Sequence, residues 1–394
     1  VNSVSQYEGS DLIHTVSLTG DSNSATTVTV TLSNGTATLG TDTTTVEYSL
    51  DGGANWMTTT VSNAGSFNVS VPAHGTQFLV KVPGVQDGTL EGPESYNISV
   101  AATGQSTAST GTGTIVDDGT ILPPGVPGEP NQPGTPDDDR PTAAVNSVSQ
   151  YEGSDLIHTV SLSNPSSTAQ TYAISLSGNT ATAGTDFDDV LANAVFSNGV
   201  TYDAGTGQIT VPAGVTSFTV GYATTQDNIF EADETTSLTI GGSTGTGTIT
   251  NDDPAPTISV DNVTATEGTD PYQVFTVSLS NPSSGPIVFN PTLSNGTAIV
   301  GTDTGTALEY NNGSGWVAVP VGGVTFAAGQ TSVQVRVSVT DDNIDEVNET
   351  FNLTATVTSG TTANTSAVGV GTIVDNDPAP TISVDNVTAT EGTD

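Results

Sequence analysis

The sequence predicts an all-β protein built as a string of β-sandwich domains. Thr, Ser, Val and Gly dominate its 394 residues, and typical helix formers are scarce. Short segments in which apolar and polar residues alternate stand between Gly, Asn and Pro turns, as expected for half-buried strands. Long stretches also recur in a fixed order, at periods well above those of stacked solenoid repeats.

The charge balance excludes several classes of partner. Asp and Glu number 42 against 3 Lys and Arg, a formal net charge of −39. Nucleic acid and anionic membrane surfaces are therefore excluded as electrostatic partners. No run of 18 apolar residues occurs, so we expect no membrane insertion, and the absence of Cys excludes disulfides and thiolate metal sites. The chain starts and stops inside a repeating pattern and has no signal peptide, which indicates a fragment of a longer protein.

Internal identity sets the expected domain boundaries. Residues 1–18 are identical to 145–162, and residues 254–270 are identical to 378–394. We predict a first sandwich at 1–118, a Pro-rich acidic linker at 119–141, a second sandwich at 142–253, a third at 254–377 and the start of a fourth at 378–394. We expect the linker, with its seven prolines, to stay comparatively mobile, whereas the next joint is only Pro-Ala-Pro.

The third sandwich illustrates the strand pattern. Its seven alternating segments lie at 257–265, 275–280, 286–294, 323–329, 333–339, 350–357 and 368–374. Seven short strands at this spacing predict an antiparallel immunoglobulin-like sandwich, and we expect such sandwiches to be arranged end to end. Residues 46–59 and 308–319 predict an inserted hairpin, with Trp56 and Trp316 at matching places.

Acidic residues cluster where the odd-numbered strands end, so we expect them to converge on one pole of each sandwich. Several share the side-chain parity of core residues, as Glu349 does with Phe351 and Asp117 with Ile115. Three cations cannot neutralise all these inward carboxylates, and unpaired buried charge is costly. A hard, oxygen-preferring cation resolves the conflict. Calcium accepts six to eight oxygens in irregular geometry and is preferred here over magnesium. A solvated acidic loop is the alternative for any single cluster, and their repetition favours the ion.

The combination of Glu-Gly, Gly-Thr-Asp, Asp-x-x-x-Glu-x-x-Glu and a terminal Asp run resembles the Calx-beta repeat family over all three sandwiches. That family comprises calcium-binding immunoglobulin-like sandwiches, known from sodium–calcium exchangers, integrin β4 and large secreted bacterial adhesins. The resemblance implies ligands at Glu8, Asp42, Asp87, Glu91, Glu94, Asp117 and Asp118; at Glu152, Asp186, Asp227, Glu231, Glu234, Asp252 and Asp253; and at Glu267, Asp303, Asp341, Asp342, Glu346, Glu349, Asp375 and Asp377.

The sequence departs from this pattern at a few positions. Gln86 and Gln226 stand where the third sandwich has Asp341, Asn251 replaces an Asp, and Gly119 stands opposite Asp377. A neutral amide offers one oxygen and no charge. The first two sandwiches are therefore expected to hold fewer ions, or to hold them more weakly, than the third.

The resemblance implies a structural function. The repeat string is most similar to the extender region of a repeats-in-toxin type adhesin. We therefore expect several Ca²⁺ ions to rigidify spacer domains that project an adhesive tip from a bacterial surface, for adhesion or biofilm formation. Expected partners are the neighbouring repeats and, through another region, a surface glycan or protein.

The sequence leaves two alternative functions. One sandwich could itself bind a glycan or protein, with Tyr310 and Trp316 as a sugar-stacking pair, although packing of the hairpin on its own domain is favoured. An enzyme is expected least, because no catalytic motif occurs and every acidic cluster recurs three times. His14 and His158 align with Phe275 and are expected to be core residues, whereas His74 falls in a turn.

Overall fold

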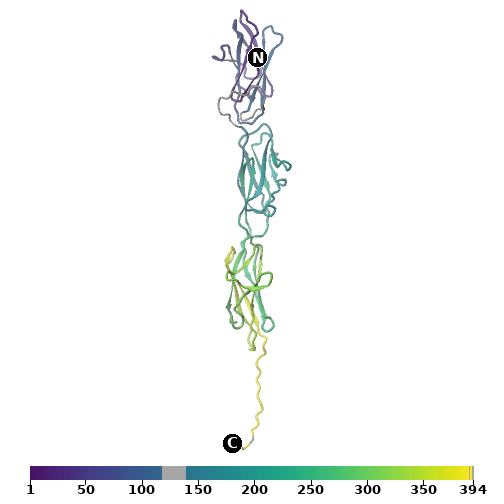
Figure 1. The fold of residues 1–394 in the computed structure, drawn as a ribbon, viewed down its shortest axis with the longest axis vertical. Helices are drawn as coiled ribbons and strands as arrows, with labels where there is room; N and C mark the ends of the chain where they lie inside the picture. Colours follow the sequence, from purple (N-terminus) through teal and green to yellow (C-terminus); the bar gives the residue numbers. More distant parts are fainter. Residues whose placement is uncertain (118–138, 390, 393–394) are drawn as a thin grey trace. The chain divides into compact units, whose positions relative to one another are not determined.

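The structure is a computed structural model that describes residues 1–117, 139–389 and 391–392. Over these residues the secondary structure consists of β-strands joined by turns and loops (Figure 1). The described part of the chain has no long apolar helix of the kind that spans a bilayer. Asp118 and linker residues 119–138 lie outside the described residues.

The described chain divides into two compact units. The first comprises residues 1–149, 155–224 and 235–248, and the second comprises residues 150–154, 225–234 and 249–394. Below, residues 1–118, 142–253 and 254–377 are called the first, second and third repeats. The division between the units passes through the second repeat and assigns its acidic loop 225–234 to the same unit as the third repeat.

The first repeat forms two sheets. One has the order β1-β9-β8-β3-β6 and the other has the order β2-β7-β4-β5. The strands are β1 (Val4–Tyr7), β2 (Asp11–Ser17), β3 (Thr26–Asn34), β4 (Glu47–Ser49), β5 (Met57–Thr58), β6 (Gly65–Val71), β7 (Gln77–Pro83), β8 (Glu94–Ala102) and β9 (Ser109–Val116).

The second repeat also forms two sheets, with the orders β10-β12-β17-β14 and β11-β19-β18-β13-β16-β15. The strands are β10 (Ala143–Val145), β11 (Val148–Tyr151), β12 (Leu156–Leu162), β13 (Gln170–Gly178), β14 (Val195–Phe196), β15 (Thr201–Asp203), β16 (Gln208–Val211), β17 (Ser217–Tyr222), β18 (Glu234–Ile240) and β19 (Ser243–Thr250).

The third repeat has sheets of order β20-β22-β27-β24-β25 and β21-β29-β28-β23-β26. The strands are β20 (Ile258–Val260), β21 (Val263–Thr266), β22 (Tyr272–Leu279), β23 (Ile287–Asn295), β24 (Glu309–Asn311), β25 (Trp316–Ala318), β26 (Val324–Phe326), β27 (Ser332–Ser338), β28 (Glu349–Ser359) and β29 (Ser366–Val374). Residues 375–389, which include most of the expected fourth repeat, form no strand.

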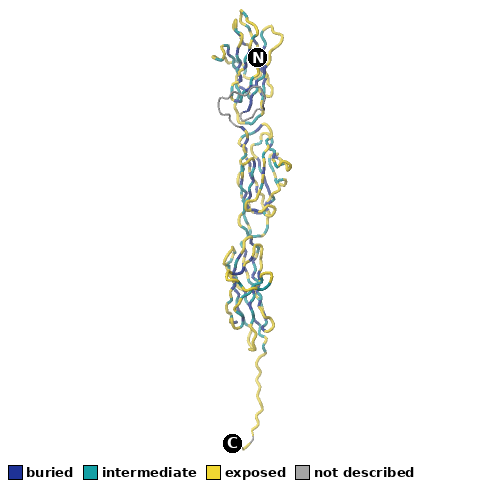
Figure 2. The backbone as a smooth tube through the Cα atoms, in the orientation of Figure 1, coloured by how far each residue is buried: buried dark blue, intermediate teal, exposed yellow. Residues whose placement is uncertain are grey.

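Each pair of sheets encloses a separate apolar core. In β3, β7 and β8 alternate side chains are buried, as period-two patterning requires, and Val30, Val80 and Ile98 are all fully buried. Figure 2 shows buried positions along the strands and exposed ones along most of the loops. The predicted all-β sandwich architecture is confirmed.

One strand pair decides where the functional residues meet. β1 pairs with β9 in parallel, and β21 pairs with β29 in the same way, although the other pairs in these two repeats are antiparallel. Parallel strands end at the same edge of a sheet. The residues that follow them, Glu8 after β1 and Asp117 after β9, are therefore neighbours, and Glu8 N donates to Val116 O at 3.0 Å.

The inserted hairpins pack on their own sheets. β4 pairs with β5 and β24 pairs with β25. The Arg336 guanidinium lies 4.3 Å from the ring centroid of Trp316 and 3.8 Å from that of Tyr272. In the first repeat, Lys81 Nζ lies 4.7 Å from the Trp56 ring centroid. Each tryptophan therefore covers a cation of its own domain, which supports the packing role over the sugar-stacking one.

The buried histidine of the first repeat is fully hydrogen-bonded. His14 is 0% exposed, and its Nδ1 and Nε2 pair with Asn2 O at 2.9 Å and Tyr96 Oη at 2.8 Å. The third repeat has phenylalanines at the two corresponding positions, Phe275 and Phe351, with ring centroids 5.9 Å apart. The expectation that His14 is a core residue is confirmed.

Replacing this pair is expected to show a non-additive effect on stability. His14→Phe alone leaves the buried Tyr96 hydroxyl without its partner and should destabilise the first repeat by about 1–3 kcal/mol. His14→Phe combined with Tyr96→Phe recreates the apolar pair of the third repeat and should recover most of that loss. Denaturant unfolding of the four species in a double-mutant cycle measures the coupling, and additive losses would contradict it.

The same pair predicts a pH effect. Burial lowers the pKa of His14 from 6.5 to about 4. The unfolded state then binds more protons between these values, so the contribution of His14 is complete above pH 6.5 and is lost as the pH falls towards 4. The loss can reach about 3 kcal/mol. The double variant should lack this component when its pH–stability curve is compared with that of the parent chain in calcium.

Candidate metal centre

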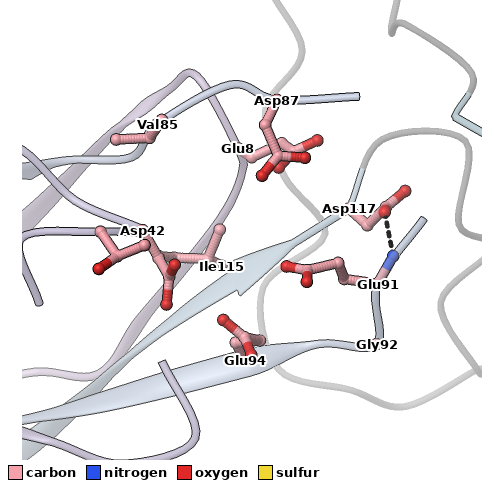
Figure 3. Close-up of a pocket in the computed structure, with 10 residues that line it drawn as sticks. Glu8, Asp42, Val85, Asp87, Glu91, Gly92, Glu94, Ile115 and Asp117 are labelled. Carbon is pink, nitrogen blue, oxygen red and sulfur yellow. Dashed lines mark hydrogen bonds between the residues drawn. The ribbon is translucent and has the colours of Figure 1, made fainter. Parts of the chain in front are cut away.

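The carboxylates of the first repeat line one small cavity (Figure 3). Its volume of about 20 Å³ is enough for a water-sized occupant. The acidic residues that line it are Glu8, Asp42, Asp87, Glu91, Glu94 and Asp117. Six of the seven residues predicted for this repeat therefore converge, and the seventh, Asp118, lies outside the described residues.

The Glu-Gly motif has a steric explanation. Gly9, Gly153 and Gly268 have φ values of +68°, +74° and +64°, which glycine adopts readily. A Cβ on Gly9 would lie 2.8 Å from Gln86 Oε1, and one on Gly268 would lie 2.6 Å from Asp341 Oδ1. Glycine thus lets the acidic loop approach closely. The predicted equivalence of the Gln86 and Asp341 positions is also supported.

Local turns hold the acidic side chains in place. In the Gly-Thr-Asp turns, one carboxylate oxygen accepts from the backbone N of the residue four positions earlier: Thr38 to Asp42 at 2.6 Å, Thr182 to Asp186 at 2.5 Å and Ile299 to Asp303 at 2.7 Å. In the acidic loops, Oδ1 of the first Asp accepts from the N two residues later, at 2.7 Å for each of Asp87, Asp227 and Asp342. The same sequence signals therefore build the same turns in all three repeats.

One member of the first site, Asp139, is not predicted by the sequence motifs. Carboxylate oxygens of Glu8, Asp117 and Asp139 lie within 4.8 Å of one another, and Asp139 is 1% exposed. Asp139 thus takes the place in this cluster that Asp377 has beside Glu267 and Asp375, and Gly119, which stands opposite Asp377 in the sequence, lies outside the described residues. The signal was available in the spacing: Asp139 precedes Glu152 by 13 residues, and Asp253 precedes Glu267 by 14.

Asp139 corrects one premise of the expectation that linker 119–141 is comparatively mobile, namely that no acidic cluster spans its length. Asp117 before the linker and Asp139 near its end lie in one cluster. An ion bound there would tie the two ends together. The behaviour of residues 119–138 falls outside the described chain.

The third repeat has the same arrangement in a cavity of about 10 Å³. Its acidic lining comprises Glu267, Asp303, Asp342, Glu346, Glu349 and Asp375. Asp377 joins Glu267 and Asp375 in a group whose carboxylate oxygens lie within 4.8 Å of one another. Asp341 lies beside Gly268, at the edge of this set.

The second repeat brings Glu152, Asp227 and Asp253 within the same 4.8 Å. Asp252 accepts from Gln226 Nε2 at 3.0 Å, and its backbone N donates to Glu152 Oε1 at 3.2 Å. Asn251 Oδ1 accepts a hydrogen bond from Glu231 N at 3.2 Å. In the first repeat, Asp117 Oδ2 accepts the equivalent hydrogen bond from Glu91 N. Glu231 and Glu234 keep the sequence positions of the acids that line the first cavity.

The electrostatics favour a bound cation. Burial, followed by the carboxylate of Asp42, raises the pKa of Glu94 to about 7. Burial and the neighbouring Asp375 and Asp377 raise the pKa of Glu267 to about 7. The pKa of Glu152 is also raised, first by burial and then by nearby aspartates. Carboxyl groups crowded together away from water resist ionisation, and a cation among them would reverse this penalty.

Lys81 and Arg336 do not supply the positive charge that would offset these carboxylates. Lys81 Nζ pairs with Glu47 at 2.5 Å, and Arg336 pairs with Glu309 at 2.7 Å, both beside the hairpins. Asp253 Oδ2 and Asp377 Oδ2 are buried and have no hydrogen-bond partner. Orphaned carboxylate oxygens of this kind fit a hard metal ion that prefers oxygen ligands.

Comparison with known families agrees with this geometry. The model of the Calx-beta domain matches residues 3–62, 145–255 and 250–377, which is well over half of the chain. The chain belongs to the Calx-beta domain family. The family resemblance predicted from the motifs is confirmed, and the Calx-beta match covers sequence in all three repeats.

Solved structures give weaker likenesses. The calcium binding domain CBD12 of CALX1.1 is 13% identical, covering 60% of this chain and 77% of that one, with a TM-score of 0.24. The Calx CBD1 domain in its apo form is 18% identical, and the match covers 31% of this chain and 99% of that one, with a TM-score of 0.23. The titin fragment I67–I69 is 9% identical, and the match covers 95% of this chain and 96% of that one, with a TM-score of 0.25. Scores this low support no further conclusion. No curated protein matches the chain.

The position of Asp341 predicts a difference among the repeats. In the first repeat Gln86 Nε2 donates to Glu8 Oε1 at 3.2 Å, whereas Asp341 offers a further carboxylate. We expect Asp341→Gln to weaken calcium binding by the third repeat by about tenfold, because affinity rises with ligand charge. Calorimetric titration of the full chain measures this, with Gln86→Asp as the reciprocal variant. Unchanged binding in Asp341→Gln would show that this position is not a ligand.

Proposed function

We propose that the chain is a set of calcium-rigidified spacer domains from a secreted bacterial surface adhesin, which hold a binding tip away from the cell. The observation that carries the proposal is the cavity of convergent carboxylates, which recurs in the first and third repeats. Calcium suits it because the residues provide only oxygen ligands in irregular geometry. Bound ions would neutralise a pole of each sandwich that otherwise repels itself.

The membership of the Calx-beta family supports the calcium assignment. Calx-beta domains are calcium-binding β-sandwich modules. The acidic composition and the repetition support an extracellular spacer, because a repeated module with one ion-binding pole adds length and stiffness rather than a new binding chemistry. Its partners would be the neighbouring repeats and, through another region, a glycan or a protein on a surface.

The alternative, that one repeat itself binds a glycan, has less support. The two acidic cavities, of about 20 and 10 Å³, are far smaller than the several hundred cubic ångströms of a small-molecule site, so such a ligand would need another cavity, such as the one of about 390 Å³ beside Val16 and Val100 in the first repeat. The aromatic pair considered for sugar stacking is also engaged, because Trp316 packs on Arg336. The small acidic cavities likewise give no support to a catalytic role.

Small-angle scattering tests the spacer role. In calcium, the full chain is expected to behave as an elongated particle with a well-defined maximum dimension. In chelator the distribution of dimensions should broaden as the joints loosen. Magnesium at the same concentration is the control and should restore little of the calcium effect. A compact globule in both conditions would contradict the proposal.

A further inference from the structure

The acidic loop of the first repeat makes backbone contacts with the second repeat. Leu90 N donates to Pro165 O at 3.0 Å, and Leu90 O accepts from Ser167 N at 2.9 Å. Leu90 and Ser166 therefore form an isolated parallel β-bridge. Both backbone groups of one loop residue are satisfied by the next repeat, as in the addition of a strand to a sheet edge.

The second compact unit contains the same device. Phe230 N donates to Pro282 O at 2.9 Å, and Phe230 O accepts from Ser284 N at 3.0 Å. Phe230 and Ser283 form a parallel bridge. Phe230 occupies the sequence position of Leu90, and the two acceptor segments share one sequence, Ser-Asn-Pro-Ser-Ser, at 163–167 and 280–284. Two independent joints thus pair the same loop with the same motif.

Hydrogen bonds within each repeat hold the Ser-Asn-Pro-Ser-Ser motif in place. Ser166 O accepts from Gly214 N at 2.8 Å and Ser283 O accepts from Gly329 N at 2.9 Å, so each motif is held to its own repeat in the same way. The Asn side chain of each motif also donates hydrogen bonds to segments that approach the motif. Asn164 Nδ2 donates to Gly88 O at 3.2 Å and to Asp139 Oδ1 at 3.0 Å. Asn281 Nδ2 donates to Pro254 O at 3.0 Å.

In the described chain, the acidic loop of the third repeat forms no such bridge, and Asp345 stands at the position of Leu90 and Phe230. Ile229 and Ile344 are identical residues at the same position, and their amides make the same 2.7 Å hydrogen bond to the preceding aspartate. Ile229 is half-buried, whereas Ile344 is 59% exposed. The local turn therefore forms without docking.

We propose that the acidic loop of each repeat is a latch that docks on the Ser-Asn-Pro-Ser-Ser motif of the following repeat, so that ion binding and docking strengthen each other. The bridging residue lies inside the ligand set, since Leu90 stands between Asp87 and Glu91. An ion that orders this loop presents the backbone of Leu90 in its docked form. By linkage, docking must then raise the affinity for the ion by the same factor. The inference rests on the calcium role proposed above.

A proline scan of the acceptor tests the latch in the full chain. Ser167→Pro removes the N–H that donates to Leu90 O and touches no proposed ligand. Asn23→Pro is the matched control: residue 23 holds the same place in the first repeat, because His74 N bonds to Ser22 O as Gly214 N bonds to Ser166 O. Ser284→Pro repeats the test at the second joint. Exchange of amides in β12 and β22 reports that the altered repeat remains folded.

Hydrogen exchange and calcium calorimetry are the two measurements. In the parent chain the Leu90 and Phe230 amides should exchange at least about tenfold more slowly in calcium than in chelator. Ser167→Pro should abolish this difference at Leu90 and weaken calcium binding by the first repeat about 3- to 10-fold, the effect of one backbone hydrogen bond. Asn23→Pro should change neither.

The outcomes separate the two proposals. The chain could bind calcium normally while the Leu90 and Phe230 amides exchange at the same rate in calcium as in chelator. This result would overturn the latch but leave the spacer function standing. Equal calcium affinities in Ser167→Pro, Ser284→Pro and the control would likewise overturn it. Absence of calcium binding in the parent chain would overturn the proposed function together with the latch.

Discussion

Removing calcium is expected to lower the melting temperature of the chain by more than about 10 °C. A ligand that binds only the folded state stabilises it by about 2.7 kcal/mol per site at 100 times its Kd. Two ions in a repeat would thus contribute about 5 kcal/mol, and 1 kcal/mol shifts the melting temperature of a domain of this size by several degrees. The apo state also loses stability from mutual repulsion, because Glu8, Glu152 and Glu267 are buried at the acidic pole.

The measurement is calorimetric melting of the full chain in excess calcium, in excess chelator, and in chelator followed by magnesium. Calcium should restore the original transition, whereas magnesium should restore little because it demands a stricter octahedron. Sodium chloride at equal ionic strength controls for simple screening of the net charge of −39. An identical melt in calcium and chelator would remove the basis of the metal assignment.

Asp139→Asn is expected to weaken calcium binding by the first repeat by at least about tenfold, because it removes one of the carboxylates grouped there. The substitution keeps the shape of the side chain and an oxygen for the hydrogen bond from Asn164 Nδ2. The second and third repeats should keep their affinities, which makes them internal references. Calorimetric titration of the full chain measures the change.

Asp155→Asn is the matched control, since Asp155 is an exposed carboxylate outside the clusters and its loss changes the net charge equally. If both variants bound calcium equally well, Asp139 would have no role as a ligand. Loss of binding in Asp139→Asn alone would show that a residue at the end of the Pro-rich segment completes the site of the preceding repeat. The ion would then hold Asp117 and Asp139, on either side of residues 118–138, in one site.

The sequence by itself determined the strands, the repeats and most of the acidic site. Alternation along β3 and β8 identifies the core face, and the same alternation turns Glu94 and Glu349 towards the acidic pole. The Gly-Thr-Asp and Asp-x-x-x-Glu-x-x-Glu patterns form the same turns in each of the three repeats, because their hydrogen bonds span only two to four residues. Such local signals are legible in a sequence.

The tertiary structure decided what depends on partners distant in the chain. The parallel pairing of β1 with β9 places Glu8 beside Asp117, and the return of the chain after the linker brings in Asp139. The bridges made by Leu90 and Phe230 carry no side-chain signature, because backbone groups form them.

Two pairs of identical segments show the limit most directly. Residues 1–18 and 145–162 form matching strands, β1 and β2 in one copy and β11 and β12 in the other. Residues 254–270 form β20 and β21, whereas the described residues of the identical segment 378–394 form no strand and are largely exposed. β20 and β21 pair with β22 and β29, and the second copy pairs with no strand in the described chain. A β-strand needs the hydrogen bonds of a neighbour, so the same sequence is a strand only where the fold supplies one.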